Sequence, residues 1–125
     1  MLESLHVRNY VLIDKLDLDF AEGLSVITGE TGSGKSIILG ALGLLLGNKA
    51  DKEAVRNGSD MAEVSGTFSI DGDDVKSWCR DHDIDISEDS LTLRRIIRTN
   101  GRSTFSVNGS AISRSEGEEL GMLLV

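Results

Sequence analysis

The sequence predicts an α/β fold in which a strand–loop–helix unit lies beside an antiparallel β-subdomain. Three observations predict it. The glycine-rich stretch GETGSGKS (Gly29–Ser36) lies between a short apolar run and an apolar helical stretch. Two segments with alternating apolar and polar residues precede it, as in half-buried strands. Two Asn-Gly pairs follow it, each between β-prone runs, which is the pattern of a β-meander.

The segments before the loop predict three strands. Residues Leu2–Asn9 and Leu12–Phe20 alternate apolar and polar side chains, the second more regularly than the first. This period of two is typical of strands that bury one face. Residues Leu24–Gly29 form a short apolar run that ends in glycine, which predicts a buried strand feeding the loop.

After the loop, a helix is expected to begin near Lys35 and to continue through Leu46. Its residues are apolar on nearly every side, which predicts burial all round. Gly47-Asn48 is expected to cap its C-terminus. Beyond a polar connection, Ala62–Ile70 predicts a strand and Asp73–His82 a short helix.

The second half of the chain predicts hairpins and a last helix. Asn100-Gly101 and Asn108-Gly109 are the strongest short hairpin signals, because both residue types tolerate positive φ. The segment Ser113–Val125 is expected to form a helix that leads into an apolar run.

Composition restricts the class of protein. The chain has 125 residues, of which 39% are hydrophobic and 27% charged, as in a soluble globular domain with its own core. The apolar run Ile37–Gly47 is about half of the roughly 20 residues that a membrane span needs. No secretory signal begins the chain, and Cys79 is the only cysteine, so neither an internal disulfide nor a zinc cluster is expected. We therefore expect a cytoplasmic protein with no membrane partner.

The net charge of −8 argues against this chain as a general DNA-binding surface, because contacts to phosphates need a basic patch. It leaves open DNA binding by other parts of a larger protein.

The loop matches the phosphate-binding pattern G-x-x-x-x-G-K-[ST] through Gly29, Gly34, Lys35 and Ser36. A chain of typical composition would match by chance at a rate on the order of a few in a thousand. The predicted strand before the loop and the predicted helix after it supply the context that the motif requires.

The chemistry of the motif follows from its residue types. Glycines let successive backbone N–H groups point at one anion, and a helix N-terminus adds partial positive charge there. Lys35 is expected to reach the β- and γ-phosphates of ATP and to stabilise charge during phosphoryl transfer, and Ser36 to ligate Mg²⁺. The residues expected to contact the nucleotide are Gly29, Glu30, Thr31, Gly32, Ser33, Gly34, Lys35 and Ser36.

A hydrolytic half is not visible in the sequence. The aspartate that ends an apolar strand and anchors Mg²⁺ should follow four apolar residues, and no such run is found after the loop. We therefore expect another segment or another chain to supply it. Two strands ahead of the loop and a meander after it are typical of the first lobe of an ABC-type ATPase head, rather than of small P-loop kinases.

The stretch Leu2–Gly47, with RNYVLID, GETGSGKS and SIILGALGLLLG, resembles the N-terminus of the RecN-type branch of the SMC-like ATPases. The meander LRRIIRTNGRSTFSVNGSAIS resembles the SMC-type pattern of an arginine strand, a glycine turn, an aromatic strand and an Asn-Gly turn. The similarity covers nearly the whole chain and is weakest over Asp71–Asp89.

The resemblance implies that residues 1–125 are the N-terminal lobe of a split ATPase head, with the coiled coil and the C-terminal lobe absent. In this family the C-terminal lobe carries the signature motif and the Walker B residues, and two heads sandwich two ATP molecules. The implied partners are the C-terminal lobe of the same protein, a second head in a homodimer, and DNA through the full-length protein. The implied function is ATP-controlled DNA holding in double-strand-break repair and recombination, in the bacterial cytoplasm at the nucleoid.

The resemblance also implies further site residues. Arg8 and Asn9 lie where SMC-like heads place residues near the base and sugar, although ordinary strand-end polar residues would look the same. Lys49 lies where relatives carry an arginine that approaches the nucleotide or DNA, but lysine lacks the bidentate fork. Two other functions remain open: a stand-alone P-loop kinase, and a non-catalytic nucleotide-binding or dimerisation module.

Other polar residues favour structural roles. A solvated hairpin face is favoured over a DNA contact for the arginines of the meander region, Arg94, Arg95, Arg98, Arg102 and Arg114. The segment from Asp71 resembles a calcium loop only at its start, because Lys76 stands where glycine is required and His82 where glutamate is. His6 has no nearby ligand set, and Trp78 and Cys79 are expected to pack their helix.

Overall fold

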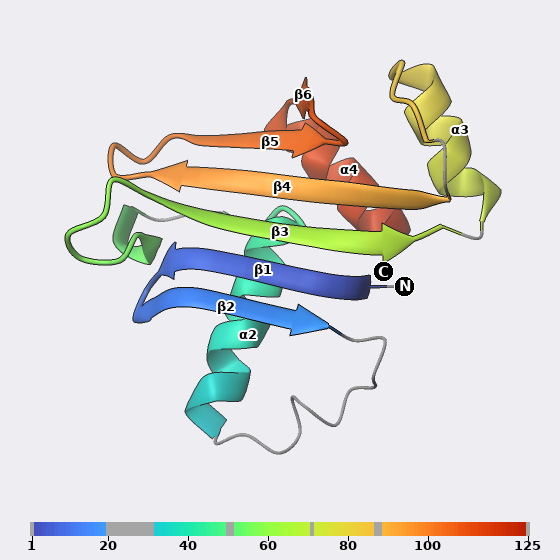
Figure 1. Ribbon diagram of the computed structural model, residues 1–125. Helices are drawn as coiled ribbons and strands as arrows, with labels where there is room; N and C mark the ends of the chain where they lie inside the picture. The colour runs from blue at the N-terminus through green and yellow to red at the C-terminus, as the bar shows by residue number, and fades with distance from the viewer. Residues whose placement is uncertain (1, 20–31, 50–51, 71, 87–88, 125) are drawn as a thin grey trace.

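The computed structural model describes residues 2–19, 32–49, 52–70, 72–86 and 89–124, without the side chains of residues 32–37 and 52. Within them, six strands form one antiparallel sheet with the order β2-β1-β3-β4-β5-β6 (Figure 1). The strands are β1 (Leu2–Tyr10), β2 (Ile13–Asp19), β3 (Met61–Ser69), β4 (Ser90–Arg98), β5 (Ser103–Val107) and β6 (Ser110–Ile112). The helices are α2 (Gly32–Leu45), the 3₁₀-helix η2 (Lys52–Ala54), α3 (Asp73–Asp81) and α4 (Arg114–Leu124).

The alternating segments form strands as predicted. The two segments before the loop are β1 and β2, which pair with each other, and β3 pairs with β1 on its other side. Along β3, buried side chains alternate with partly exposed ones, so one face of the sheet is apolar and the other polar. The predicted strand Leu24–Gly29 lies outside the described residues.

Both Asn-Gly pairs turn the chain, with different geometries. Asn108 (φ 49°) and Gly109 (φ 88°) both have positive φ, as a two-residue turn between β5 and β6 requires. In the β4–β5 connection only Gly101 (φ 88°) does, and its N–H donates to the carbonyl of Arg98 at 3.0 Å. This longer connection needs glycine at one position only.

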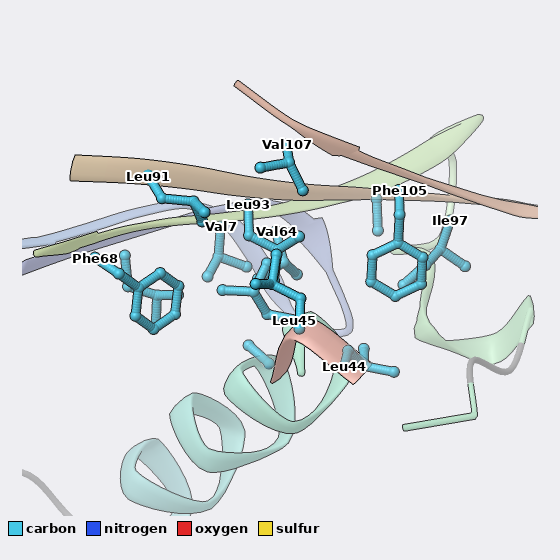
Figure 2. Packing of buried hydrophobic residues seen from close by; sticks show 14 of the residues in the cluster. Val7, Leu44, Leu45, Val64, Phe68, Leu91, Leu93, Ile97, Phe105 and Val107 are labelled. Atoms are coloured by element: carbon cyan, nitrogen blue, oxygen red, sulfur yellow. The ribbon is translucent and has the colours of Figure 1, made fainter. Parts of the chain in front are cut away.

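Helices α2 and α4 pack against the apolar face of the sheet, which is the face behind the strands in Figure 1. Leu45 of α2 is fully buried among side chains of the central strands, such as Val64 and Leu93 (Figure 2). The prediction that the helix is buried all round is wrong, because Leu39 remains 57% exposed. The sheet covers one side of α2, and no other described element covers the side that carries Leu39.

The predicted C-cap of α2 is confirmed. The N–H of Asn48 donates to the carbonyl of Gly43 at 3.0 Å, and that of Gly47 to the carbonyl of Leu44 at 3.2 Å. This pair of bonds is the Schellman motif, which places its C′ residue in the left-handed region. Gly47 occupies that position with φ 110°, where a Cβ would be strained.

A capping box starts α4. The N–H of Glu116 donates to Oγ of Ser113 at 3.1 Å, and the N–H of Ser113 donates to Oε1 of Glu116 at 2.8 Å. These bonds to Ser113 hold the pKa of the Glu116 carboxyl below its usual value. The signal for this cap, serine followed three residues later by glutamate, is present in the sequence.

Helix α3 docks on α4 through its aromatic residues. The indole Nε1 of Trp78 donates to Oε1 of Glu119 at 3.2 Å, and Nε2 of His82 lies 3.3 Å from Oε2 of Glu116. The rings of Trp78 and His82 stack with centroids 3.9 Å apart, and Cys79 is buried. The predicted packing role of Trp78 and Cys79 is confirmed. The segment that resembles the start of a calcium loop folds largely as α3.

None of the helices in the described residues has the length and hydropathy of a membrane-spanning segment.

Candidate nucleotide-binding site

The second half of the glycine-rich motif forms the start of α2. The helix has 14 residues and begins at Gly32, earlier than the predicted start near Lys35. Gly29, Glu30 and Thr31 lie outside the described residues, as do the side chains from Gly32 to Ser36. The requirement that the motif opens a helix is therefore met, while the contacts of the individual motif side chains stay predictions.

This helix end suits a phosphate group. The first N–H groups of a helix lack partners within it, and the helix dipole makes the same end partly positive. No acidic residue lies in the first turn of α2. No carboxylate of that turn therefore competes with an anion for these N–H groups, and the start of α2 suits a phosphate group.

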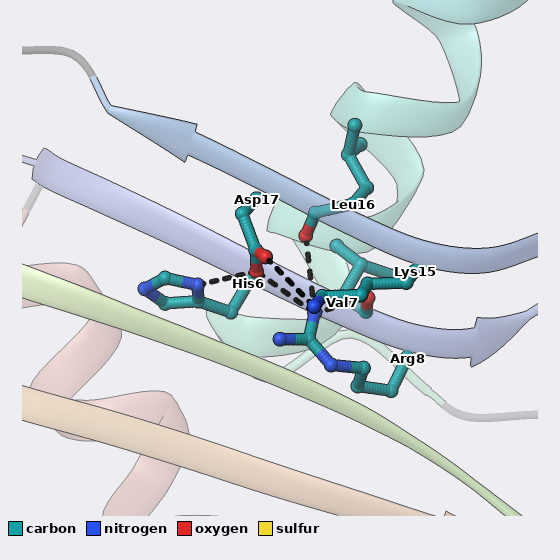
Figure 3. Close-up of polar contacts among 6 residues, drawn as sticks. All are labelled: His6, Val7, Arg8, Lys15, Leu16 and Asp17. Atoms are coloured by element: carbon teal, nitrogen blue, oxygen red, sulfur yellow. Dashed lines mark hydrogen bonds and ion pairs between the residues drawn. The ribbon is translucent and has the colours of Figure 1, made fainter.

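Arg8 lies on the polar face of the sheet, opposite α2. Its Nη1 lies 2.8 Å from Oδ1 of Asp17 and also donates to the carbonyl of Val7 at 2.9 Å (Figure 3). His6 contacts the same carboxylate oxygen through Nδ1 at 2.6 Å. The role of Arg8 at the base or sugar stays a prediction, and these contacts hold its guanidinium away from the helix that carries the motif.

His6, rather than the lysine beside it, is expected to control the acidity of Asp17. Hydrogen bonds from His6 and then Arg8 hold the Asp17 pKa below its ordinary value of 3.8. We expect His6→Ala to raise this pKa and Lys15→Met to leave it nearly unchanged, because Nζ of Lys15 lies 3.9 Å away. Carboxyl carbon shifts in an NMR pH titration measure it.

The sign of the linked effect on stability follows. A depressed pKa in the folded state stabilises the protein above the unfolded pKa, and this contribution is lost as pH falls through the folded value. Below about pH 4, the free energy of unfolding of His6→Ala should therefore fall less steeply with decreasing pH than that of the wild type. An equal response of the pKa to Lys15→Met would contradict the assignment of the shift to His6.

The tip of the β1–β2 hairpin is tied to the chain that follows α2. Asn9 (φ 53°) accepts a hydrogen bond at its carbonyl from the N–H of Arg56 at 2.8 Å. Val11 (φ 53°) donates from its N–H to the carbonyl of Ala54 at 2.7 Å. The backbone of Asn9 thus has a structural role, and a contact of Asn9 with the nucleotide stays a prediction.

Lys49 follows the C-cap of α2 and is exposed. It lies at the opposite end of the helix from the motif, so Lys49 is too far along α2 to contact a phosphate group at the start of the same helix. Contact with the nucleotide of a second head, or with DNA, stays a prediction.

The arginines of the meander region do not share one surface. Arg94 forms an ion pair with Glu63, and Arg114 pairs with Glu118 at 3.3 Å. Arg98 and Arg102 are exposed, in agreement with a solvated hairpin face. Arg95 is the exception, because it is 1% exposed on the apolar face. The prediction of a solvated face is therefore wrong for this residue.

A signal for the burial of Arg95 was present in the sequence. Every second residue of β4 faces the apolar side of the sheet, and Arg95 lies in this series between Leu93 and Ile97. The sequence gives no indication of the groups that satisfy this buried cation, because they belong to other elements.

Comparison with known proteins agrees with this geometry. The family model described as "AAA domain" matches residues 4–120. The chain is 40% identical to the DNA repair protein RecN of Bacillus subtilis and 41% identical to RecN of Vibrio cholerae, in both cases over 100% of its length. It spans 22% and 23% of the length of these two relatives.

Solved structures show the same fold. A chain from a study of ATP-driven dimerization and DNA-stimulated activation of SMC ATPases superposes with a TM-score of 0.71 at 26% identity, covering 97% of this chain and 79% of that one. The SMC head domain from Thermotoga maritima superposes with a TM-score of 0.63 at 18% identity, covering 94% of this chain and 41% of that one. The chain belongs to the AAA domain family, is similar over its whole length to RecN, and has the fold of an SMC-type ATPase head lobe.

Proposed function

We propose that this chain is the ATP-binding, N-terminal lobe of an SMC-like ATPase that acts in DNA double-strand-break repair and recombination. The observation that carries the proposal is that α2 begins inside the motif GETGSGKS, with no acidic residue in its first turn. The similarity to RecN over the whole chain supports the role in DNA repair.

Different residues of this chain would bind the phosphates of ATP and the Mg²⁺ ion. Backbone N–H groups from Gly29 to Ser36 would hold the phosphates, Lys35 would neutralise charge on the β- and γ-phosphates, and the hydroxyl of Ser36 would ligate the metal. Bound Mg²⁺ supplies charge neutralisation between the two phosphates. The residues that orient the attacking water are expected from the C-terminal lobe, because the sequence after the loop offers no Walker B run.

The C-terminal lobe is also the expected cover for α2. Leu39 is 57% exposed on the outward side of the helix. Exposed leucines are unremarkable singly, but this helix carries apolar residues on nearly every side. The relatives are more than four times as long as this chain, which leaves ample length for a second lobe that buries this side. A second head would then complete the ATP sandwich, and DNA would bind the engaged pair.

The two other functions lack a supporting observation. A stand-alone kinase would need an acceptor site and a lid, and the sequence shows neither an arginine-rich lid nor a substrate-pocket signature. A non-catalytic binding module would hold nucleotide without turnover even when the rest of the head is present.

Titration with Mg·ATP and a turnover assay test the proposal. The complete gene product that contains this chain should bind ATP and hydrolyse it, whereas the 125-residue chain should show almost no turnover until the C-terminal lobe is added. Phosphate transfer or robust hydrolysis by the chain alone would overturn the split-head proposal. Binding without turnover by the complete protein would favour the non-catalytic module.

A further inference from the structure

Arg95 is a buried cation in the centre of the fold. It lies on β4 facing α2 and is 1% exposed, and it is the one charged side chain among the described residues that is buried to this degree. A buried guanidinium is costly unless its N–H groups find acceptors. The acceptors of Arg95 therefore show what the residue holds in place.

Those acceptors lie mainly at the C-terminal end of α2. Nη1 of Arg95 donates to the carbonyl of Leu44 at 2.8 Å and to that of Asn48 at 2.5 Å. The last carbonyls of a helix lack partners within it, and the helix dipole makes this end partly negative. A cation at this place stabilises the helix end and completes the cap formed by Gly47 and Asn48.

The rest of the side chain is fixed by β5. Nη2 donates to Oγ of Ser103 at 3.2 Å, and the guanidinium carbon lies 4.5 Å from the centre of the Phe105 ring. Arg95 therefore joins β4, β5 and α2 through one planar group. Its Nε has no hydrogen-bond partner among the described residues. Only Nη1 and Nη2 therefore form hydrogen bonds, the first with the end of α2 and the second with Ser103.

No carboxylate of the described residues forms an ion pair with Arg95. Burial, and then the positive charge of Arg114, lower its pKa to about 10, which the charge of Glu118 partly opposes. The residue is still protonated at neutral pH, so its charge is offset by backbone carbonyls of the helix end. Neutral or shorter replacements would remove this donor from both carbonyls, and the carbonyl of Leu44 would keep only its bond from the N–H of Gly47.

We propose that Arg95 is a positioning residue for the nucleotide site: it fixes the C-terminal end of α2 against β4 and β5, and thereby sets where the N-terminal end of the helix meets the phosphates. The inference rests on the proposed function. A helix of 14 residues spans about 21 Å and moves as a unit, so a shift at Leu44 is transmitted to Gly32. Lysine cannot reproduce these contacts, because its three N–H donors lie on one nitrogen atom, whereas the guanidinium of arginine presents its donors in a fixed plane.

The test compares neighbouring arginines of β4 in the complete gene product. Arg95→Lys keeps the charge inside the fold, and Arg94→Lys makes the same change at an exposed residue of the same strand. We expect Arg95→Lys to raise the Kd and the KM for Mg·ATP about tenfold, since small misplacement of a binding group is costly. Arg94→Lys should change both by less than about twofold, because its ion pair lies on the solvated face.

Binding is measured at a temperature where circular dichroism shows every variant fully folded, so loss of stability alone cannot change the Kd. Wild-type affinity in the folded Arg95→Lys variant would overturn the inference. If that variant does not fold, Ser103→Ala, which removes one partner of Arg95, should raise the Kd by about two- to threefold. An unchanged Kd would then overturn the inference. Failure of the wild type to bind ATP would instead overturn the proposed function, and this inference with it.

Discussion

Replacing Lys35 by alanine is expected to weaken Mg·ATP binding by the complete gene product at least a hundredfold. The proposed role of the ammonium group is to contact the β- and γ-phosphates at the start of α2. Two charge-assisted hydrogen bonds lost at this site correspond to about 3 kcal/mol, or roughly a hundredfold in Kd. Calorimetric titration measures the change directly.

Lys49→Ala is the matched control for this experiment. It removes the same charge from the opposite end of α2, where Lys49 is exposed beyond the C-cap. We expect its Kd for Mg·ATP to stay within about threefold of the wild type in the absence of head pairing, because an exposed charge at that distance is largely screened. Equal losses in the two variants would indicate general attraction of an anion rather than a phosphate site at Gly29–Ser36.

The contact between Gly66 and Leu45 is expected to dominate the docking of α2 on the sheet. A Cβ at Gly66 would lie 2.6 Å from Cδ2 of Leu45 and 3.2 Å from Cδ1 of Leu2, and Leu45 is fully buried. Gly66→Ala should therefore lower the free energy of unfolding by about 1–3 kcal/mol through overpacking. Leu45→Ala should lower it by about 3 kcal/mol, because it leaves a cavity.

The double variant distinguishes this contact from general destabilisation. With Leu45 shortened, the new Cβ at Gly66 has room, so we expect the combined loss to be smaller than the sum by about 1 kcal/mol or more. Leu120→Ala, a buried leucine on α4, is the control, and its combination with Gly66→Ala should be additive. Urea denaturation of the 125-residue chain measures all five variants, and additivity of the Gly66–Leu45 pair would contradict the proposed contact.

Local patterns were sufficient for most of the elements. The alternation before the loop became β1 and β2, and the Asn-Gly pairs became turns, because period and turn chemistry depend on near neighbours in the chain. Gly47 ends α2 for the same reason. The exposure of Leu39 was not predicted, because an apolar pattern all round a helix does not indicate which sides the described fold covers.

The sequence by itself determined the motif of the proposed phosphate site, the order of the elements along the chain and the family. Tertiary structure alone decided that β1 lies between β2 and β3, and that α2 packs on the face that contains Arg95. It also decided that Arg95 is bound by carbonyls of Leu44 and Asn48 rather than by a carboxylate. These features depend on groups far apart in the chain, which come together only when the apolar faces of the sheet and the helices are buried against each other.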